Sequence, residues 1–560
     1  LKTLTIIDQS VKRINAKAKN ERDHININNL SLKDTETFEL LQRGETTGIF
    51  QLESRGMRDY LKQLVPNDFE DIVSMNALYR PGALGMNMVD SYINRKHGRE
   101  EVTYGHESVK KILSTTYGVI VYQEQVMQIA QELSGFSLGQ ADILRRAMGK
   151  KKKEEMESLR STFVDGAVKK DVNENYAANL FDQIEQFAGY GFNRSHSVGY
   201  ALIAYQTAWL KTHFPAEFMA SVLSCDLGNT DNIQLFVDDC RNTGLSVKKP
   251  DINKSSYRFE DLDSDTILYG LGAIKGIGES LVEQIVSQRN IEQFKDMHDF
   301  CMRIGSNRIN RRILTTLIGS GAMDSFGKRE YLFRRIDSYL KNAEQASERN
   351  KSKIQDLFGE EQISPAEDAV NHDIEFDEVS SEWSALGFYL DSHPLEGKKK
   401  EVRNMCGFFI SELQSEEHKQ RIAGCLMQIN VRQGKRGRFA FATLDDGSSK
   451  IEVSIWSDVF EKYRSLLKKG QILVVEGMIE KDEYSNFAEH KMIADKILTF
   501  DQARYEYVKN IRIDIENNDI NSEELVNSLK LIANSSEGNE VLISYKGESA
   551  AADIILPSDF

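Results

Sequence analysis

The stretch FAGYGFNRSHS (residues 187–197) stands directly before the strongest helical pattern of the chain. Beyond it, apolar residues recur close to the i, i+3, i+4, i+7 spacing at Val198, Ala201, Leu202, Tyr205, Ala208 and Trp209. This spacing predicts a helix with one apolar face that begins near Ser197. Because proline lacks a backbone donor, Pro215 ends this helix or follows its end. The positive end of the helix dipole would then meet Arg194 and His196.

This helix start has two interpretations. Unsatisfied backbone N–H groups at a helix start, together with basic side chains, would stabilise a phosphate. Alternatively, Ser195 or Ser197 is only the N-cap and the glycines before it form a tight turn. The spacing alone leaves both open.

Length and composition limit the class of protein. A chain of 560 residues is too long for one hydrophobic core, so several domains are expected. No apolar run approaches the roughly 18 residues of a membrane span, and the composition is that of a soluble protein. The five cysteines lie far apart without a CxxC pair, which disfavours a disulfide framework and a structural zinc site. We therefore expect a cytoplasmic protein with no membrane partner.

The net charge of −15 argues at first against a nucleic-acid partner, since phosphate binding needs a positive surface. Its distribution changes this conclusion. Residues 359–382 and 513–560 together carry a formal charge of −17, which leaves the rest of the chain at +2. Basic clusters lie at residues 145–153, 303–335 and 432–438. Each cluster could be a solvated face, but the three together permit contact with DNA.

The pattern of apolar residues predicts a multidomain α+β protein. Residues 1–245 are mostly helical and predict one large helical domain. In residues 246–395, the glycine-rich string YGLGAIKGIG (269–278) precedes a helical spacing and predicts a hairpin between helices. The polar and then acidic residues 341–382 predict an exposed linker.

Within residues 396–500, a period of two replaces the helical spacing from about residue 420 onward. Short strands are expected at residues 422–431, 439–444, 451–456 and 472–478, separated by turns such as Asp446-Gly447. A small β-barrel is the expected result. Residues 501–560 are acidic and mixed, and predict part of a small α/β domain.

Three motifs suit contact with nucleic acid. Residues 144–153 place arginines and lysines around Gly149, which favours neutralising phosphates without reading bases. The glycines of the KGIG string (275–278) let backbone N–H groups approach a phosphate, as in helix-hairpin-helix modules. The basic loop RQGKRGR (432–438) precedes Phe439 and Phe441, where a single strand could lie. The structural alternatives are a solvated helix end, a scaffold turn and a pair of core aromatics.

No reaction centre is evident. The acid pairs Asp238-Asp239 and Asp445-Asp446 are adjacent in sequence, so their side chains point apart and make poor paired metal ligands. The chain has no HExxH motif, Walker A loop or nucleophile elbow. The residues themselves therefore indicate binding, and no catalytic or metal-ligating residue is assigned.

Five longer strings resemble the alpha subunits of bacterial DNA polymerase III, which are C-family replicative DNA polymerases. In that family's order they are GIFQLESRGM (48–57), ALYRPG (77–82), YGVIVYQEQVM (117–127), LRRAMGKK (144–151) and FAGYGFNRSH (187–196). The resemblance covers essentially residues 1–500. It implies a fingers domain (1–245), a helix-hairpin-helix and clamp-binding domain with a linker (246–395), an OB-fold domain (396–500) and a partial C-terminal domain (501–560).

The resemblance implies template-directed DNA synthesis by two-metal phosphoryl transfer. In the family, three palm aspartates hold Mg²⁺, and the resemblance puts the last of them just before Leu1. We therefore expect the chain to begin past the palm and to be inactive alone. The alternative is a non-catalytic DNA-binding scaffold that joins a helical hairpin to an OB barrel.

The resemblance also implies binding sites. It puts Arg80, Asn193, Arg194, Ser195 and His196 at the incoming nucleotide, where cations would stabilise charge on the phosphates. The residues expected to contact primer-template DNA are Tyr122, Gln123, Gln125, Arg145, Arg146, Lys150, Lys151, Lys275, Gly276, Gly278, Lys435, Arg436 and Arg438.

One further segment implies a partner protein. Ile354, Gln355, Asp356, Leu357 and Phe358 stand where the family has its sliding-clamp peptide. The usual glutamine comes first in that peptide, whereas here Ile354 is first and Gln355 follows one residue late. Leu357 and Phe358 fit the pattern. The family's other implied partners are a clamp-loader subunit, bound through the C-terminal region, and further polymerase III subunits.

Overall fold

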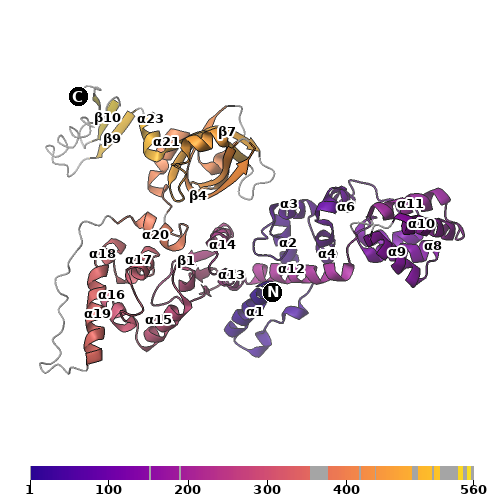
Figure 1. The fold of residues 1–560 in the computed structure, drawn as a ribbon, viewed down its shortest axis with the longest axis horizontal. Helices are drawn as coiled ribbons and strands as arrows, with labels where there is room; N and C mark the ends of the chain where they lie inside the picture. Colours follow the sequence, from indigo (N-terminus) through magenta and orange to yellow (C-terminus); the bar gives the residue numbers. More distant parts are fainter. Residues whose placement is uncertain are drawn as a thin grey trace. The chain divides into compact units, whose positions relative to one another are not determined.

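The computed structural model describes residues 2–150, 153–187, 191–352, 376–391, 393–414, 418–435, 437–481, 490–507, 510–516, 540–546 and 551–556. The chain forms two compact units, Leu1–Phe388 and Tyr389–Phe560 (Figure 1). No helix within the described ranges is long and apolar enough to cross a membrane.

The amino-terminal part of the first unit is helical. Its α-helices are α1 (Lys2–Lys17), α2 (Thr35–Arg43), α3 (Arg55–Leu64), α4 (Phe69–Leu78), α5 (Pro81–Leu84), α6 (Met88–Lys96), α7 (Glu107–Leu113), α8 (Gln123–Ser134), α9 (Leu138–Lys150), α10 (Lys153–Val168), α11 (Glu174–Phe187), α12 (Arg194–His213), α13 (Pro215–Ser224) and α14 (Thr230–Asn242). One apolar core joins α2, α3, α4 and α6 to α12, and a second joins α7 to α11. Figure 1 shows α8, α9, α10 and α11 gathered in one bundle.

Helix α12 begins at Arg194, three residues before the expected start. Its N-cap is Asn193, whose side-chain oxygen accepts the N–H of His196 at 2.9 Å. The expectation that Ser195 or Ser197 caps the helix is therefore wrong. Ser197 is buried instead, and its hydroxyl donates to the carbonyl of Val73 at 2.6 Å.

The expected apolar face of α12 is wrong at Leu202, which is 39% exposed. The buried face carries small and polar residues such as Ala204 and Thr207, because α4 and α2 pack closely against it. Pro215 occupies the first turn of α13, where its missing N–H costs nothing, and so follows the end of α12 as expected.

Ion pairs to buried carboxylates anchor α1. Arg13 contacts Asp261 at 2.5 Å and donates to the carbonyl of Phe259 at 2.7 Å. Lys17 contacts Asp261 at 2.5 Å and Glu217 at 3.0 Å. Burial alone would raise the pKa of Asp261, but the hydrogen bonds from Lys17 and Arg13 outweigh it and hold this pKa below its usual value. The pairs therefore tie α1 to the strand at residues 260–261.

The second part of the first unit mixes a small sheet with short helices. Its elements are β1 (Ser246–Lys248), β2 (Glu260–Asp261), β3 (Thr266–Leu268), the 3₁₀ turn η4 (Leu271–Ala273), α15 (Glu279–Ile291), α16 (Met297–Ile304), α17 (Arg311–Gly319), α18 (Arg329–Phe333), α19 (Ile336–Ser352) and α20 (Glu378–Leu386). The sheet has the order β1-β3-β2. The glycine-rich string joins η4 to α15, so the first arm of the expected hairpin is a single 3₁₀ turn.

The prediction of an exposed linker at residues 341–382 is wrong at both ends of this range. Residues 341–352 continue α19, and residues 378–382 begin α20. Helix α20 packs on α17 so closely that a β-carbon on Gly319 would come within 2.7 Å of the carbonyl of Ser381. The acidic composition hid this contact, which rests on the few buried residues Glu382, Ala385 and Leu386.

The second unit contains a closed barrel with strand order β4-β5-β6-β8-β7, which confirms the expected OB-type barrel. Its elements are α21 (Lys399–Cys406), β4 (Gln420–Gly434), β5 (Gly437–Asp445), β6 (Lys450–Ile455), α22 (Ser457–Tyr463), β7 (Ile472–Lys481), β8 (His490–Thr499) and α23 (Phe500–Tyr507). Strand β8, which the sequence pattern did not single out, closes the barrel between β6 and β7. A separate sheet has the order β11-β10-β9, from β9 (Asn510–Glu516), β10 (Glu540–Lys546) and β11 (Ala551–Leu556).

We predict that Arg13→Met loosens α1. The substitution leaves a buried carboxylate with one cation fewer and should lower the free energy of opening of α1 by about 1–3 kcal/mol. Hydrogen exchange of the α1 amides would measure this. Lys12→Met is the matched control, because Lys12 forms an exposed pair with Asp8 on the same helix. Equal loss of protection in both variants would contradict the prediction. In the unsubstituted chain, the lowered pKa of Asp261 means that its stabilisation is full above the unfolded-state pKa and is lost as pH falls through the folded-state pKa.

Candidate nucleic-acid interface

Two segments distant in sequence pair beside the start of α12. The backbone N–H of Gln123 donates to the carbonyl of Phe192 at 2.9 Å, and the N–H of Phe192 donates to Val121 at 3.3 Å. The side chain of Gln123 adds a hydrogen bond to the carbonyl of Gly191 at 2.9 Å. These bonds fix the start of α8 against the start of α12.

Gln125 and Tyr122 support this pairing from inside the protein. The side-chain oxygen of Gln125 accepts the N–H groups of Val121 and Tyr122, both at 2.9 Å, and its amide donates to Thr116 at 2.9 Å. The Tyr122 hydroxyl lies 3.2 Å from the hydroxyl of Ser74. Both side chains are buried. Of the three residues expected to contact DNA in this segment, Tyr122 and Gln125 thus use their polar atoms within the fold, and Gln123 alone is partly exposed.

The first turn of α12 presents charged and polar side chains to solvent. Asn193, Arg194, Ser195 and His196 are exposed, and the Arg194 guanidinium contacts Glu70 at 2.6 Å. Glu124 accepts hydrogen bonds from the Asn193 amide at 2.8 Å and from the Arg194 N–H at 3.0 Å. A carboxylate thus already binds the positive end of this helix, where a phosphate was one of the two interpretations.

A row of rings adjoins this turn. The Arg80 guanidinium lies 4.3 Å from the ring centre of Phe192, and Phe192 contacts His196. His196 lies 4.5 Å from the ring of Tyr200, which in turn contacts Phe50. Burial lowers the pKa of Arg80, which is half-buried at the start of α5. The structure therefore brings Arg80 and residues 193–196 together through Phe192. Sequence reasoning missed Phe50 and Tyr200, although Tyr200 follows His196 at the i, i+4 spacing.

The basic segment at the end of α9 is less open than its composition suggests. Arg145 and Arg146 both contact Asp142 at 2.8 Å, one to each carboxylate oxygen. The hydrogen bond from Arg145 lowers the pKa of Asp142. Lys150 is the last residue of α9, and Lys151 lies outside the described residues.

The KGIG loop presents open backbone. Gly276 has a φ of +78°, which favours glycine. Gly278 has an ordinary φ of −89° and no atom within 4 Å of where a β-carbon would stand. Neither conformation nor packing within the described chain therefore requires glycine at position 278. The Lys275 side chain is exposed. Its backbone N–H donates to the carbonyl of Ala385 at 3.0 Å, which ties the loop to α20.

The outer face of the barrel carries an aromatic cluster. In β5, Ala440 and Ala442 face the core, so Phe439 and Phe441 face outward. Their ring centres are 5.6 Å apart, and Phe439 lies at the same distance from Trp456, which is 49% exposed. The Arg432 guanidinium stands 5.5 Å from the Phe441 ring. The alternative of two core aromatics is wrong. Trp456 and Arg432 were not assigned from sequence, although Arg432 lay in the basic loop.

The expected cations beside this cluster differ in their contacts. Lys435 is exposed, whereas Arg438 contacts Glu461 at 3.0 Å. Arg436 lies outside the described residues, as do residues 354–358 of the expected clamp peptide.

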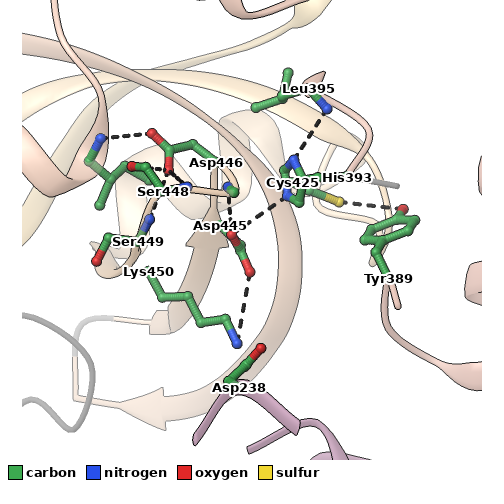
Figure 2. Close-up of polar contacts among 12 residues, drawn as sticks. Asp238, Tyr389, His393, Leu395, Cys425, Asp445, Asp446, Ser448, Ser449 and Lys450 are labelled. Carbon is green, nitrogen blue, oxygen red and sulfur yellow. Dashed lines mark hydrogen bonds and ion pairs between the residues drawn. The ribbon is translucent and has the colours of Figure 1, made fainter. Parts of the chain in front are cut away.

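The acid pair Asp445-Asp446 organises the turn after β5 (Figure 2). Asp446 is buried and accepts the N–H groups of Ile410 at 2.7 Å and Ser448 at 2.8 Å. Asp445 accepts the N–H of Gly447 at 2.8 Å and lies 3.8 Å from Lys450. No group of three or more His, Cys, Asp and Glu side chains in the described ranges is placed to hold a metal ion.

Comparison with known families agrees with this arrangement. Residues 3–171 match the bacterial DNA polymerase III alpha subunit finger domain, residues 244–332 a helix-hairpin-helix motif, and residues 421–499 an OB-fold nucleic acid binding domain. Fold and surfaces thus define a chain that joins a polymerase fingers domain to two kinds of nucleic-acid-binding module.

Individual relatives narrow the class. The chain is 44% identical over 547 residues to DNA polymerase III subunit alpha of Escherichia coli K12, covering 95% of this chain and 47% of that protein. The subunit of the same name is 40% identical over 556 residues in Pseudomonas fluorescens (94% and 47%) and 43% over 531 residues in Vibrio cholerae (92% and 46%). The chain is similar to these bacterial DNA polymerase III alpha subunits over nearly all of its own length and spans about half the length of these relatives.

We predict that Gln125→Ala destabilises the pairing of the two segments. It leaves two buried N–H groups without an acceptor and should cost about 2–4 kcal/mol. Gln123→Ala, which removes a single hydrogen bond to Gly191, should cost about 1 kcal/mol and serves as the control. Hydrogen exchange of the α8 amides measures both. Unchanged protection combined with weakened DNA binding in Gln125→Ala would contradict the structural role.

Proposed function

We propose that this chain supplies the nucleotide-binding and DNA-binding surfaces for template-directed DNA synthesis by a polymerase III alpha subunit. The observation that carries the proposal is the exposed first turn of α12, which carries Arg194 and where His196 and Arg80 both lie against the ring of Phe192, in a chain whose residues 3–171 match a fingers domain. Nucleotide addition uses Mg²⁺ held by residues outside this chain. The domain boundaries near residues 245, 395 and 500 are part of the proposal.

In this proposal Arg194 and His196 bind the phosphates of the incoming nucleotide. Their charge and donors stabilise the negative charge that develops on phosphate oxygens during transfer. Buried Gln125 and Tyr122 act only by holding the paired segments rigid, so that the exposed groups keep their positions. Preorganised donors contribute more than mobile ones, because they need no rearrangement as charge develops.

DNA contact is proposed at three further surfaces. The KGIG loop offers open backbone at Gly276 and Gly278 with Lys275 beside it, which suits a phosphate of the duplex. The aromatic cluster on the barrel suits stacked bases of a single strand, with Lys435 nearby for the backbone. Arg145 and Arg146 contribute less, because Asp142 offsets part of their charge.

Partner contacts complete the proposal. Leu357 and Phe358 bind the sliding clamp, and the C-terminal region binds a clamp-loader subunit, together with other polymerase III subunits, in the bacterial cytoplasm. The apolar end of a short peptide entering a pocket is the physical basis for the clamp contact.

We predict that Trp456→Ala weakens binding of single-stranded DNA by this chain. Loss of one stacking ring should reduce the binding free energy by about 1–3 kcal/mol. Fluorescence anisotropy with an oligo-thymidine strand measures the change. Tyr505→Ala is the control, since Tyr505 is a highly exposed aromatic on α23. Equal weakening by both substitutions would argue against a specific stacking site.

We predict that Arg194→Gln raises the KM for nucleotide in a complete alpha subunit containing this chain by about tenfold, the equivalent of about 1.4 kcal/mol. Primer extension at varied nucleotide concentration measures it, with Arg43→Gln in α2 as the control, because Arg43 forms an exposed pair with Glu45. The present chain alone should incorporate no nucleotide. Mg²⁺-dependent synthesis by the chain alone would refute the assignment of the metal ligands to residues outside it. A complete subunit unable to extend primers would instead favour a scaffold.

A further inference from the structure

The Arg194 guanidinium already has an anionic partner on the protein. It contacts the carboxylate of Glu70 at 2.6 Å, and Glu70 lies in the first turn of α4. Glu124 binds the backbone N–H of the same arginine at 3.0 Å. Two carboxylates therefore contact Arg194 at the first turn of α12, and a phosphate that binds its guanidinium has to compete with Glu70.

The surroundings support a shared site for these charges. The Arg194 guanidinium stands 5.8 Å from the ring centre of Tyr122. Burial raises the pKa of the Tyr122 hydroxyl to about 12, with further increases from Glu70 and Glu124 and a decrease from Arg194. The charges of all three side chains therefore affect the Tyr122 hydroxyl.

The neighbouring acid on α4 shows what a structural ion pair looks like here. Asp71 pairs with Lys96, and only 3% and 7% of the two side chains are exposed. Asp71 also accepts the N–H groups of Asn67 and Asp68, so the carboxylate is held by several donors. In the pair of Glu70 with Arg194, by contrast, 36% and 46% of the side chains are exposed. Water screens such a pair, and it contributes little to stability.

We infer that Glu70 competes with the nucleotide phosphates for Arg194. Its carboxylate pairs with the Arg194 guanidinium until a nucleotide binds and displaces it. The inference rests on the proposed function of Arg194. Exchange is feasible because the pair is exposed and weak, whereas a triphosphate brings several charges and acceptor oxygens to the same guanidinium. Glu70 thereby lowers affinity for all nucleotides and keeps Arg194 bound to the protein between additions.

The test is Glu70→Gln in a complete alpha subunit that contains this chain, assayed by single-nucleotide incorporation. The substitution removes the charge but keeps the length of the side chain. It should lower the KM for nucleotide by about two- to fivefold and leave kcat unchanged. Glu70→Ala should act in the same direction, which guards against an effect special to glutamine. Glu45→Gln, which removes one exposed carboxylate elsewhere in the fingers, should leave the KM unchanged.

Three outcomes would overturn the inference. A rise in KM for Glu70→Gln would mean that Glu70 positions Arg194 for the nucleotide. An equal fall for Glu45→Gln would mean that only total charge matters. A fall of the same size when Glu70→Gln is added to Arg194→Gln would mean that Glu70 acts without Arg194. If Arg194→Gln alone leaves the KM unchanged, the proposed function of Arg194 itself is wrong. This result distinguishes a failure of the role proposed for Arg194 from a failure of the role inferred for Glu70.

Discussion

The backbone pairing between residues 121–123 and 191–192 is the constraint on which the candidate site depends. It joins the start of α8 to the start of α12, which carries the exposed residues 193–196 of the candidate site. The pairing is possible because Gln125 satisfies two N–H groups of its own segment from the inside. Glu124 then holds the first turn of α12 through two further hydrogen bonds, from the Asn193 amide and from the Arg194 N–H. A few buried polar atoms thus determine where the charged side chains outside can act.

Periodicity predicted the fold class well where a single element sets its own pattern. The alternation in β5 indicated a barrel strand, and the spacing after residue 197 indicated a helix. The start of α12 was misplaced because its cap is chosen by tertiary partners: Ser197 turns inward to the carbonyl of Val73, which leaves Asn193 as the cap. The prediction of a linker at residues 341–382 was wrong for a similar reason, because a few buried residues among many acids pack α20 against α17. Composition averages over such positions and cannot reveal them.

The sequence predicts where the candidate site residues lie along the chain, but not which of them are exposed. Motif order indicated the first turn of α12, yet the same motifs included Tyr122 and Gln125, which are buried. The period of two along β5 indicates that Phe439 and Phe441 share one face of the strand. The folded barrel shows that this is its outer face and that Trp456 packs against Phe439 there. Charge was misjudged in another way, because counting residues ignores pairing. Asp142 binds both arginines of the basic segment, and Glu461 binds Arg438.

Degree of burial separates the ion pairs of this chain into two kinds. Buried carboxylates such as Asp71 and Asp261 collect several donors, and loss of one partner leaves a charge that water cannot reach. Such pairs hold helices in place and are poor candidates for exchange. The pair of Glu70 with Arg194 is half exposed, so water offsets much of what either side chain loses when the two part. A cation whose protein partner is weak can pass to a ligand at little cost. Glu70 and Asp71 are adjacent in sequence but have different roles. The Asp71 carboxylate fixes α4 to α6, whereas Glu70 leaves Arg194 available to an anion from solution.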